Sequence, residues 1–353
     1  MAHLLVRRKL LLSSHTAPSM SDALVHWTGQ AEVLRPPEKM IENRVVFAGR
    51  NAELSLYDTY CPARKVSLSS PHVLYCGMIT GSKVMHGVTE QPRSFRPHES
   101  FILAPDQCVY IDFPEAQQNR PTTCMTIEIN SQQVQQVCDK LNTRAPRDPE
   151  LQPWSYTPRA LHVPHGQETQ GLLERLTRLF AEDHSDRNAL IDLALDELIV
   201  RMLRTQGREL LLTDSQPGKS PRHGLAAVLQ WLQNNVAETF DGQRLAKEAS
   251  MSKARLYRQF KSQLGCTPRE YQQHLRLERA RALLADESAS ITRICFELGY
   301  RSLSHFTHCF KVATGMPPGQ FRREHAQKKS ISPEYGDNPE AVPDGSRRWD
   351  SPY

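Results

Sequence analysis

Hydrophobic positions recur with helical spacing in two stretches of the C-terminal half, and the two stretches resemble each other. Ser252 to Tyr271 reads SKARLYRQFKSQLGCTPREY, and Ser302 to Phe321 reads SLSHFTHCFKVATGMPPGQF. In each stretch two apolar side chains four positions apart share one helix face. They are Leu256 and Phe260 in the first copy and Phe306 and Phe310 in the second. A repeat of this kind indicates one supersecondary unit built twice.

Signals for helix ends flank both copies. Ser252 and Ser302 suit the N-cap position, and Gly265 and Gly315, each followed by a proline, are placed to end the helices. A short amphipathic helix is predicted before each copy, over Gln243–Ala249 and Ile291–Leu298. A short helix, a tight turn and a second helix opened by serine form the helix-turn-helix pattern.

A continuous helix is predicted between the two units, over Pro268–Ala285. A helix of that length spans about 27 Å at its rise of 1.5 Å per residue. Successive major grooves on one face of B-DNA lie about 34 Å apart, which is similar. The sequence therefore predicts two groove-reading helices on one rigid body, entering adjacent grooves.

Upstream, the pattern changes from helix to strand between residues 45 and 129. Short runs rich in β-branched and aromatic residues are separated by Pro, Gly and Asp. The runs are Val45–Phe47, Leu54–Tyr57, Val73–Ile79, Ser100–Leu103, Val109–Phe113 and Thr123–Ile129. They favour a small sandwich or jelly-roll barrel, whose interior can hold a small ligand. The expected fold class is α+β: an N-terminal β-barrel or cupin-like jelly roll with helices, then an all-α domain with two helix-turn-helix motifs.

Helices are also predicted over 131–141, 168–181 and 188–212, with a short one near 21–27, whereas the proline-rich stretch 142–164 reads as a loop. The apolar stripe of the third helix is interpreted as intramolecular core, with a dimer seam as the alternative; it comprises Leu190, Leu193, Ala194, Leu198 and Met202. The expected organisation is a flexible leader (1–35), a sensing and dimerisation domain (36–212), a linker (213–223), a DNA-binding domain (224–325) and a disordered tail (326–353).

Charge is unevenly distributed along the 353 residues. Residues 222–325 carry 16 Lys and Arg against 9 Asp and Glu, whereas the rest of the chain has a net charge of −2. The basic excess therefore coincides with the repeated helices and suits a phosphate-facing surface. A solvated basic surface without a nucleic-acid partner is the alternative.

Eight scattered cysteines without a CxxC pair favour reduced thiols in a cytoplasmic protein. No apolar run is long enough to cross a membrane. His72, His86 and His98 lie in or beside the predicted strands, so a barrel enzyme or sensor with a metal on these histidines is the competing hypothesis. Without an HxH pair, an obvious carboxylate ligand or an activated nucleophile, we expect no metal, no cofactor and no catalytic residues.

The C-terminal hundred residues resemble the DNA-binding domain of the AraC/XylS family of bacterial transcription regulators. The resemblance covers Gly224–Glu324, and residues of both copies carry it. The first copy matches at Leu245-Ala246, Ser252, Leu256, Arg258, Phe260-Lys261, Gly265, Pro268, Tyr271, Arg276-Leu277 and Ala280; the second matches at Ile294, Gly299-Tyr300, Ser302, Phe306, Phe310-Lys311, Gly315, Pro317-Pro318 and Phe321-Arg322. Cys295 and His308 depart from the usual alanine and arginine. The N-terminal part resembles the family's sensing domain only loosely.

The resemblance implies that each second helix reads the major groove. By position, the base-reading residues would be Lys253, Ala254, Arg255, Tyr257 and Arg258 in the first helix and Leu303, Ser304, Thr307 and His308 in the second. Phosphate contacts would come from Arg244, Ser252, Lys261, Arg301, Ser302 and Lys311. The second set offers poorer donors, so we expect weaker reading of its half-site. The partners implied are double-stranded promoter DNA, RNA polymerase, a second copy of the chain and, in some members, a small-molecule effector.

Overall fold

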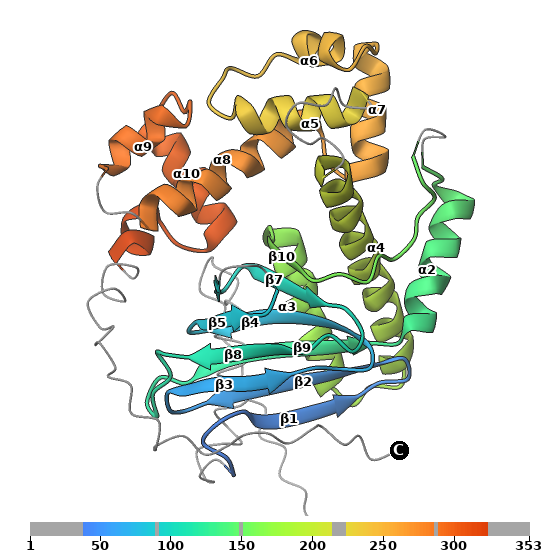
Figure 1. The fold of residues 1–353 in the computed structure, drawn as a ribbon, viewed down its shortest axis with the longest axis vertical. Coiled ribbons are helices and arrows are strands. Elements are labelled where there is room, and N and C mark those ends of the chain that lie inside the picture. Colours follow the sequence, from blue (N-terminus) through green and yellow to red (C-terminus); the bar gives the residue numbers. More distant parts are fainter. Residues whose placement is uncertain (1–37, 89–91, 148–150, 214–223, 286–288, 324–353) are drawn as a thin grey trace, which may run out of the picture. The chain divides into compact units, whose positions relative to one another are not determined.

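The computed structural model describes residues 38–88, 92–147, 151–213, 224–285 and 289–323. The expected leader, its short helix, the tail and nearly all of the linker lie outside these ranges. Within them, antiparallel sheets come first and helices follow (Figure 1), which confirms the α+β class.

Two antiparallel sheets form the N-terminal domain. The first has the order β1 (Asn43–Ala48), β2 (Ala52–Thr59), β9 (Thr122–Ile129), β4 (Val73–Thr80), β7 (Glu99–Leu103) and β10 (Leu161–Pro164). The second has the order β3 (Ala63–Leu68), β8 (Val109–Phe113), β5 (Lys83–His86) and β6 (Arg93–Phe95). Apart from the consecutive pairs β1–β2 and β5–β6, neighbours in these orders are not consecutive along the chain, as expected for a double-sheet jelly roll.

Large apolar side chains from both sheets fill the space between them. The six-stranded sheet contributes Phe101 and Met78, and the four-stranded sheet contributes Phe95, Phe113 and Met85, each at most 1% exposed. The region in which the sequence suggested a ligand is therefore occupied by a packed core.

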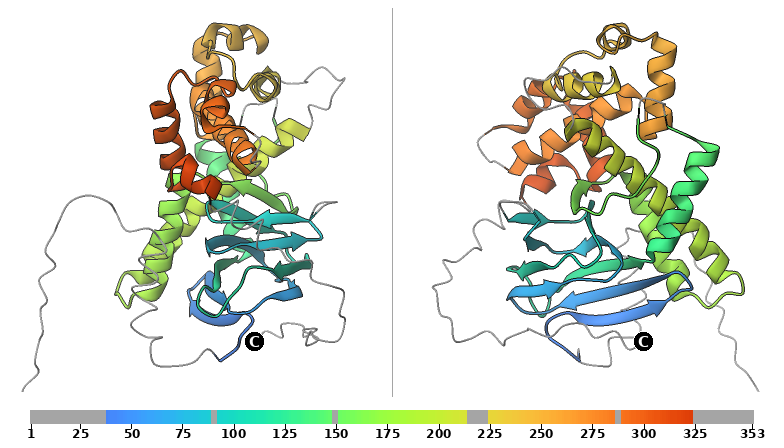
Figure 2. Two further views of the ribbon diagram at one scale, coloured as in Figure 1. Left: turned by 90° about the vertical axis from the view of Figure 1, so that its left-hand side faces the viewer. Right: turned by 45° about the vertical axis from the view of Figure 1, so that its right-hand side comes forward.

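Three helices complete this domain: α2 (Ser131–Arg144), α3 (Gln167–Ala181) and α4 (Arg187–Thr213). The Thr177 hydroxyl of α3 lies 3.9 Å from the Met125 sulfur of β9, so α3 covers the face of the six-stranded sheet opposite the barrel core (Figure 2). The apolar stripe of α4 is mainly intramolecular core, because Ala194, Leu198 and Met202 are at most 2% exposed.

The structure corrects two sequence-based assignments in this domain. The stretch 142–164 is not a loop throughout: α2 continues to Arg144, and β10 pairs with β7 over Leu161–Pro164. Strands β3, β5, β6 and β10 were also missed. In β3 and β5 lysine and arginine occupy strand positions, which hides the alternation that marks a half-buried strand.

The labelled helices that follow within the described ranges are α5 (Gly224–Asn234), α6 (Gly242–Glu248), α7 (Lys253–Leu264), α8 (Pro268–Ala285), α9 (Ile291–Glu297) and α10 (Leu303–Thr314). They enclose two separate cores. The first joins α5, α6 and α7 to Tyr271 at the start of α8. The second joins α9 and α10 to Leu277, Ala280 and Leu284 in the rest of α8. Helix α8 thus belongs to both helix-turn-helix units (Figure 1).

The predicted ends of α7 and α10 are confirmed. The Ser252 hydroxyl accepts the Arg255 amide and the Ser302 hydroxyl accepts the His305 amide, each at 3.2 Å. Gly265 and Gly315 end these helices with φ of 77° and 79°, a left-handed conformation that glycine adopts without steric cost. The local sequence therefore fixes both the length and the limits of the repeated helix.

All eight cysteines are free; Cys76, Cys124, Cys138 and Cys295 are buried, Cys61, Cys266 and Cys309 are partly exposed and Cys108 is exposed. Across the described ranges, the structure contains no helix that combines the length and apolarity needed to cross a bilayer.

Candidate nucleic-acid interface

Helix α7 has a buried face and a cationic exposed face. Leu256, Gln259, Phe260 and Gln263 point into the first core. The opposite face exposes Lys253, Ala254, Arg255, Arg258, Lys261 and Ser262. Helical spacing alone separates these faces, and it presents four cationic side chains along one 12-residue helix.

Arg258 and Tyr257 differ in how freely they can reach a ligand. Among the described residues, no hydrogen bond or ion pair engages the exposed Arg258 guanidinium, so its donors are available. Tyr257 is only partly exposed, and the Lys253 ammonium lies 5.9 Å from its ring centroid. A Cβ on Gly242 would lie 3.0 Å from the Tyr257 hydroxyl, so glycine at the start of α6 leaves room for this ring.

Helix α10 repeats this arrangement with different chemistry. Phe306, Phe310 and Thr314 are buried, while Leu303, Ser304 and His308 are exposed and Thr307 is half-buried. Lys311 is the only lysine or arginine within α10. The exposed face of α10 therefore carries fewer strong hydrogen-bond donors than that of α7, as the sequence indicates.

His305 is an exposed residue of this face that the sequence reasoning missed. Its Nε2 atom lies 3.4 Å from the Cys309 sulfur, and its ring centroid lies 5.8 Å from that of Tyr300. It directly follows Ser304 and precedes the buried Phe306, so the helical pattern could have identified it.

The residues expected at phosphates have different surroundings. Lys261, Arg301 and Lys311 are exposed. Arg244 forms an ion pair with Glu238 at 2.9 Å and lies 4.6 Å from the centroid of the Trp231 ring. The Ser252 and Ser302 hydroxyls accept capping bonds through oxygen, which leaves each hydroxyl proton available for a phosphate.

Two of the three histidines of the metal hypothesis, His86 and His98, have different neighbours. His86 bonds Asp112 at 2.9 Å, whereas His98 lies near His165, with ring centroids 6.2 Å apart. Burial lowers the pKa of His98 to about 4, and the charges of His165 and Arg281 act in the same direction. Over the described ranges, no three His, Cys, Asp or Glu side chains gather in a group that could hold a metal ion.

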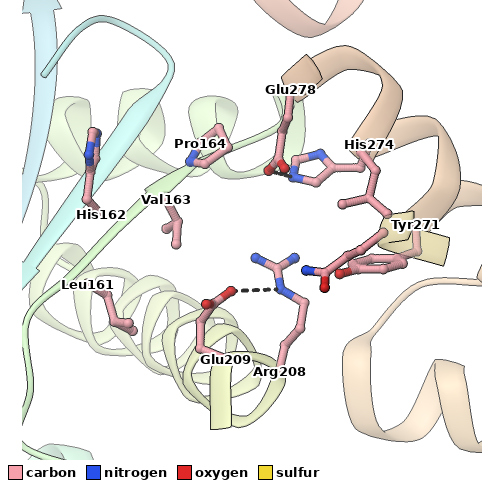
Figure 3. Close-up of a pocket in the computed structure, with 11 residues that line it drawn as sticks. Leu161, His162, Val163, Pro164, Arg208, Glu209, Tyr271, His274 and Glu278 are labelled. Carbon is pink, nitrogen blue, oxygen red and sulfur yellow. Dashed lines mark ion pairs between the residues drawn. The ribbon is translucent and has the colours of Figure 1, made fainter. Parts of the chain in front are cut away.

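A pocket is lined by residues of β10, α4, α5 and α8 (Figure 3). Its volume is about 190 Å³, less than the roughly 300–1,000 Å³ usual for small-molecule sites. The charged groups in it pair with each other: Arg208 with Glu209 at 3.6 Å, and His274 with Glu278 at 2.9 Å. The pocket therefore offers an effector little room, and the charges of these two pairs are already engaged.

A jelly-roll domain followed by two helix-turn-helix units on a shared helix defines a class of two-domain helix-turn-helix proteins. Models of known protein families match both domains of this chain. Residues 51–210 match the AraC-type transcriptional regulator N-terminus, and residues 245–324 match a helix-turn-helix domain. The chain belongs to the AraC/XylS family of transcription regulators.

The individual proteins similar to this chain match it at modest identity and over part of its length. The HTH-type transcriptional activator RhaS of Escherichia coli is 29% identical over 161 residues, which cover 45% of this chain and 57% of that protein. The HTH-type transcriptional regulator MtrA of Neisseria gonorrhoeae is 30% identical over 131 residues, covering 37% and 43%. The chain thus spans about half the length of these relatives. ToxT from Vibrio cholerae, a solved structure, aligns over 78% of this chain and 98% of its own at 12% identity, with a TM-score of 0.35.

Proposed function

We propose that this protein is a sequence-specific DNA-binding regulator of transcription, with α7 and α10 entering adjacent major grooves of promoter DNA. One observation carries the proposal: two capped 12-residue helices belong to units that share a single 18-residue helix. RhaS and MtrA, which match part of the chain, are described as a transcriptional activator and a transcriptional regulator, and this supports the same role.

In this proposal α7 supplies the stronger sequence reading. Arg258 donates two hydrogen bonds to guanine O6 and N7, and Ala254 and Tyr257 contact thymine methyl groups. Lys253 and Arg255 complete the base-facing set. On α10, Leu303, Ser304, Thr307 and His308 read the second half-site, partly through DNA shape. The phosphate set orients the protein without contributing sequence information.

The N-terminal domain is the proposed site of dimerisation and of any effector. Leu193 of α4 is 64% exposed and Leu190 is 38% exposed, so part of the stripe remains available to a second copy. DNA-bound protein would activate or block RNA polymerase from its position at the promoter. We place this activity in the bacterial cytoplasm. The domain boundaries near residues 36, 213, 224 and 326 are part of the same proposal.

Binding to a promoter fragment should fall steeply with salt. Four cationic side chains, Arg244, Lys261, Arg301 and Lys311, are assigned to phosphates. Each neutralised phosphate contributes about −0.9 to the slope of log K against log salt, which gives a slope of about −4 per protomer. Band shifts between low and physiological salt measure this slope, with unrelated DNA of equal length as the control. Equal affinity for the two fragments would contradict sequence-specific binding, and a slope near zero would contradict the four phosphate assignments.

A further inference from the structure

One side chain of the connecting helix bonds three carbonyl groups of the first unit. Arg276 of α8 donates from Nε to the Val236 carbonyl at 2.9 Å, and from Nη2 to the carbonyls of Glu238 at 2.8 Å and Ala237 at 3.3 Å. These carbonyls belong to the loop between α5 and α6. Gln272, one turn earlier, also donates to the Glu238 carbonyl, at 2.8 Å. The loop is therefore fixed to α8 by several donors.

The same guanidinium contacts the second unit. Its carbon lies 5.6 Å from the centroid of the Tyr300 ring, in the turn between α9 and α10. Tyr300 is 4% exposed, and its hydroxyl accepts a hydrogen bond from Gln273 of α8 at 2.8 Å. Arginine is suited to this double contact because its planar group can stack on a ring while its edge donates hydrogen bonds.

Gly299 allows this close approach. Its φ is 76°, and a Cβ at this position would lie 2.0 Å from the Ala237 carbonyl oxygen and 3.0 Å from Nη2 of Arg276. A side chain would push the turn of the second unit away from the loop of the first. The two helix-turn-helix units thus meet directly at a contact formed by loop 236–238, Arg276, Gly299 and Tyr300, which we call the inter-unit joint.

We propose that Arg276 is a positioning residue that fixes the spacing at which α7 and α10 meet DNA. This inference rests on the proposed function. Helix α8 alone limits the distance between the units, but each unit could still rock about its own end of the helix. The joint removes that freedom because one guanidinium donates hydrogen bonds to the first unit and lies 5.6 Å from the centroid of the Tyr300 ring in the second. Arg276 needs no DNA contact for this role.

The consequence is discrimination between half-site spacings. Adding one base pair moves the second half-site by about 3.4 Å and rotates it by about 34° about the duplex axis. A protein with a fixed angle between its units cannot follow that rotation and loses contacts at one half-site. A protein whose units move independently can keep both. Breaking the joint should therefore weaken binding at the natural spacing and flatten the preference for it.

The test compares full-length protein on three DNA fragments: the natural site and two with one base pair inserted or deleted between the half-sites. Wild type should bind the altered fragments at least about tenfold more weakly, on the scale of one lost base contact. Arg276→Ala should reduce the ratio of the affinity for the natural site to that for the altered fragments to less than about threefold. Arg276→Lys, which keeps the charge without the planar fork, should behave similarly and is the second variant if alanine impairs folding. Arg279→Ala, an exposed arginine on the same helix, is the matched control and should keep the wild-type ratio.

The ratio of affinities for the natural and altered fragments separates a positioning role of Arg276 from a general loss of stability. A variant that is only less stable binds all three fragments more weakly by the same factor and leaves the ratio unchanged, which would overturn the positioning role. Unchanged ratios in both Arg276 variants would do the same. If wild type itself fails to bind the natural site above unrelated DNA, the proposed function fails instead.

Discussion

Replacing Arg258 with alanine should lower affinity for the specific site by about 5- to 150-fold, corresponding to the roughly 1–3 kcal/mol of a bidentate arginine–guanine pair. The side chain is exposed on the cationic face of α7, and none of the described residues engages its donors. The backbone beneath it is set by the Ser252 cap and the buried Leu256 and Phe260, so truncation should remove a contact without moving the helix. Fluorescence anisotropy at fixed salt measures the change, and binding to unrelated DNA should fall much less.

Two variants control for charge and for position. Arg293→Ala removes an arginine of α9 that is paired only loosely with Glu297, at 3.9 Å, and should change specific binding little. His308→Ala, at the corresponding position of α10, should weaken binding less than Arg258→Ala. A larger loss from His308 than from Arg258 would overturn the asymmetry between the two helices, and no loss from Arg258 would remove it from the base-reading set.

Phe260→Ala should destabilise the first helix-turn-helix unit by about 3–5 kcal/mol, as is usual for a truncated buried phenylalanine. Phe260 is fully buried in the core of α5, α6 and α7, with its ring centroid 6.2 Å from that of Tyr271. That loss is a large share of the roughly 5–15 kcal/mol that stabilises a typical domain. Denaturant unfolding followed by circular dichroism gives the free energy of unfolding.

The matched control is Phe296→Ala, because Phe296 lies on α9 and is 57% exposed. It should change the unfolding free energy by less than about 0.5 kcal/mol, as surface substitutions usually do. Phe310→Ala, the repeat partner of Phe260 in the second core, should resemble Phe260→Ala. Similar small losses for the buried and exposed phenylalanines would contradict the two-core organisation.

The repeated helices could be predicted closely because their determinants are local. Serine caps, left-handed glycines and pairs of apolar residues four apart fix each helix, and the predicted connector Pro268–Ala285 has the observed bounds of α8. The same local periodicity assigned the exposed and buried faces of α7. Cys295, a departure from the family pattern, is fully buried in the second core.

Long-range contacts account for most of what the sequence did not reveal. Lys83 begins a strand and is 1% exposed, with its ammonium 3.3 Å from the Cys124 sulfur and 5.5 Å from the centroid of the Phe95 ring. No pattern rule places a lysine in a barrel core, so β5 was missed. Arg276 matched the family pattern, yet its bonds reach backbone carbonyls about forty residues away, which no side-chain pattern records.

Hydroxyl-radical footprinting of the full-length protein on a bound promoter fragment tests the central claim most directly. Two helices held by one 18-residue connector should protect two patches on the same face of the duplex, with centres about ten base pairs apart. A single protected patch, or two patches on opposite faces, would contradict the account.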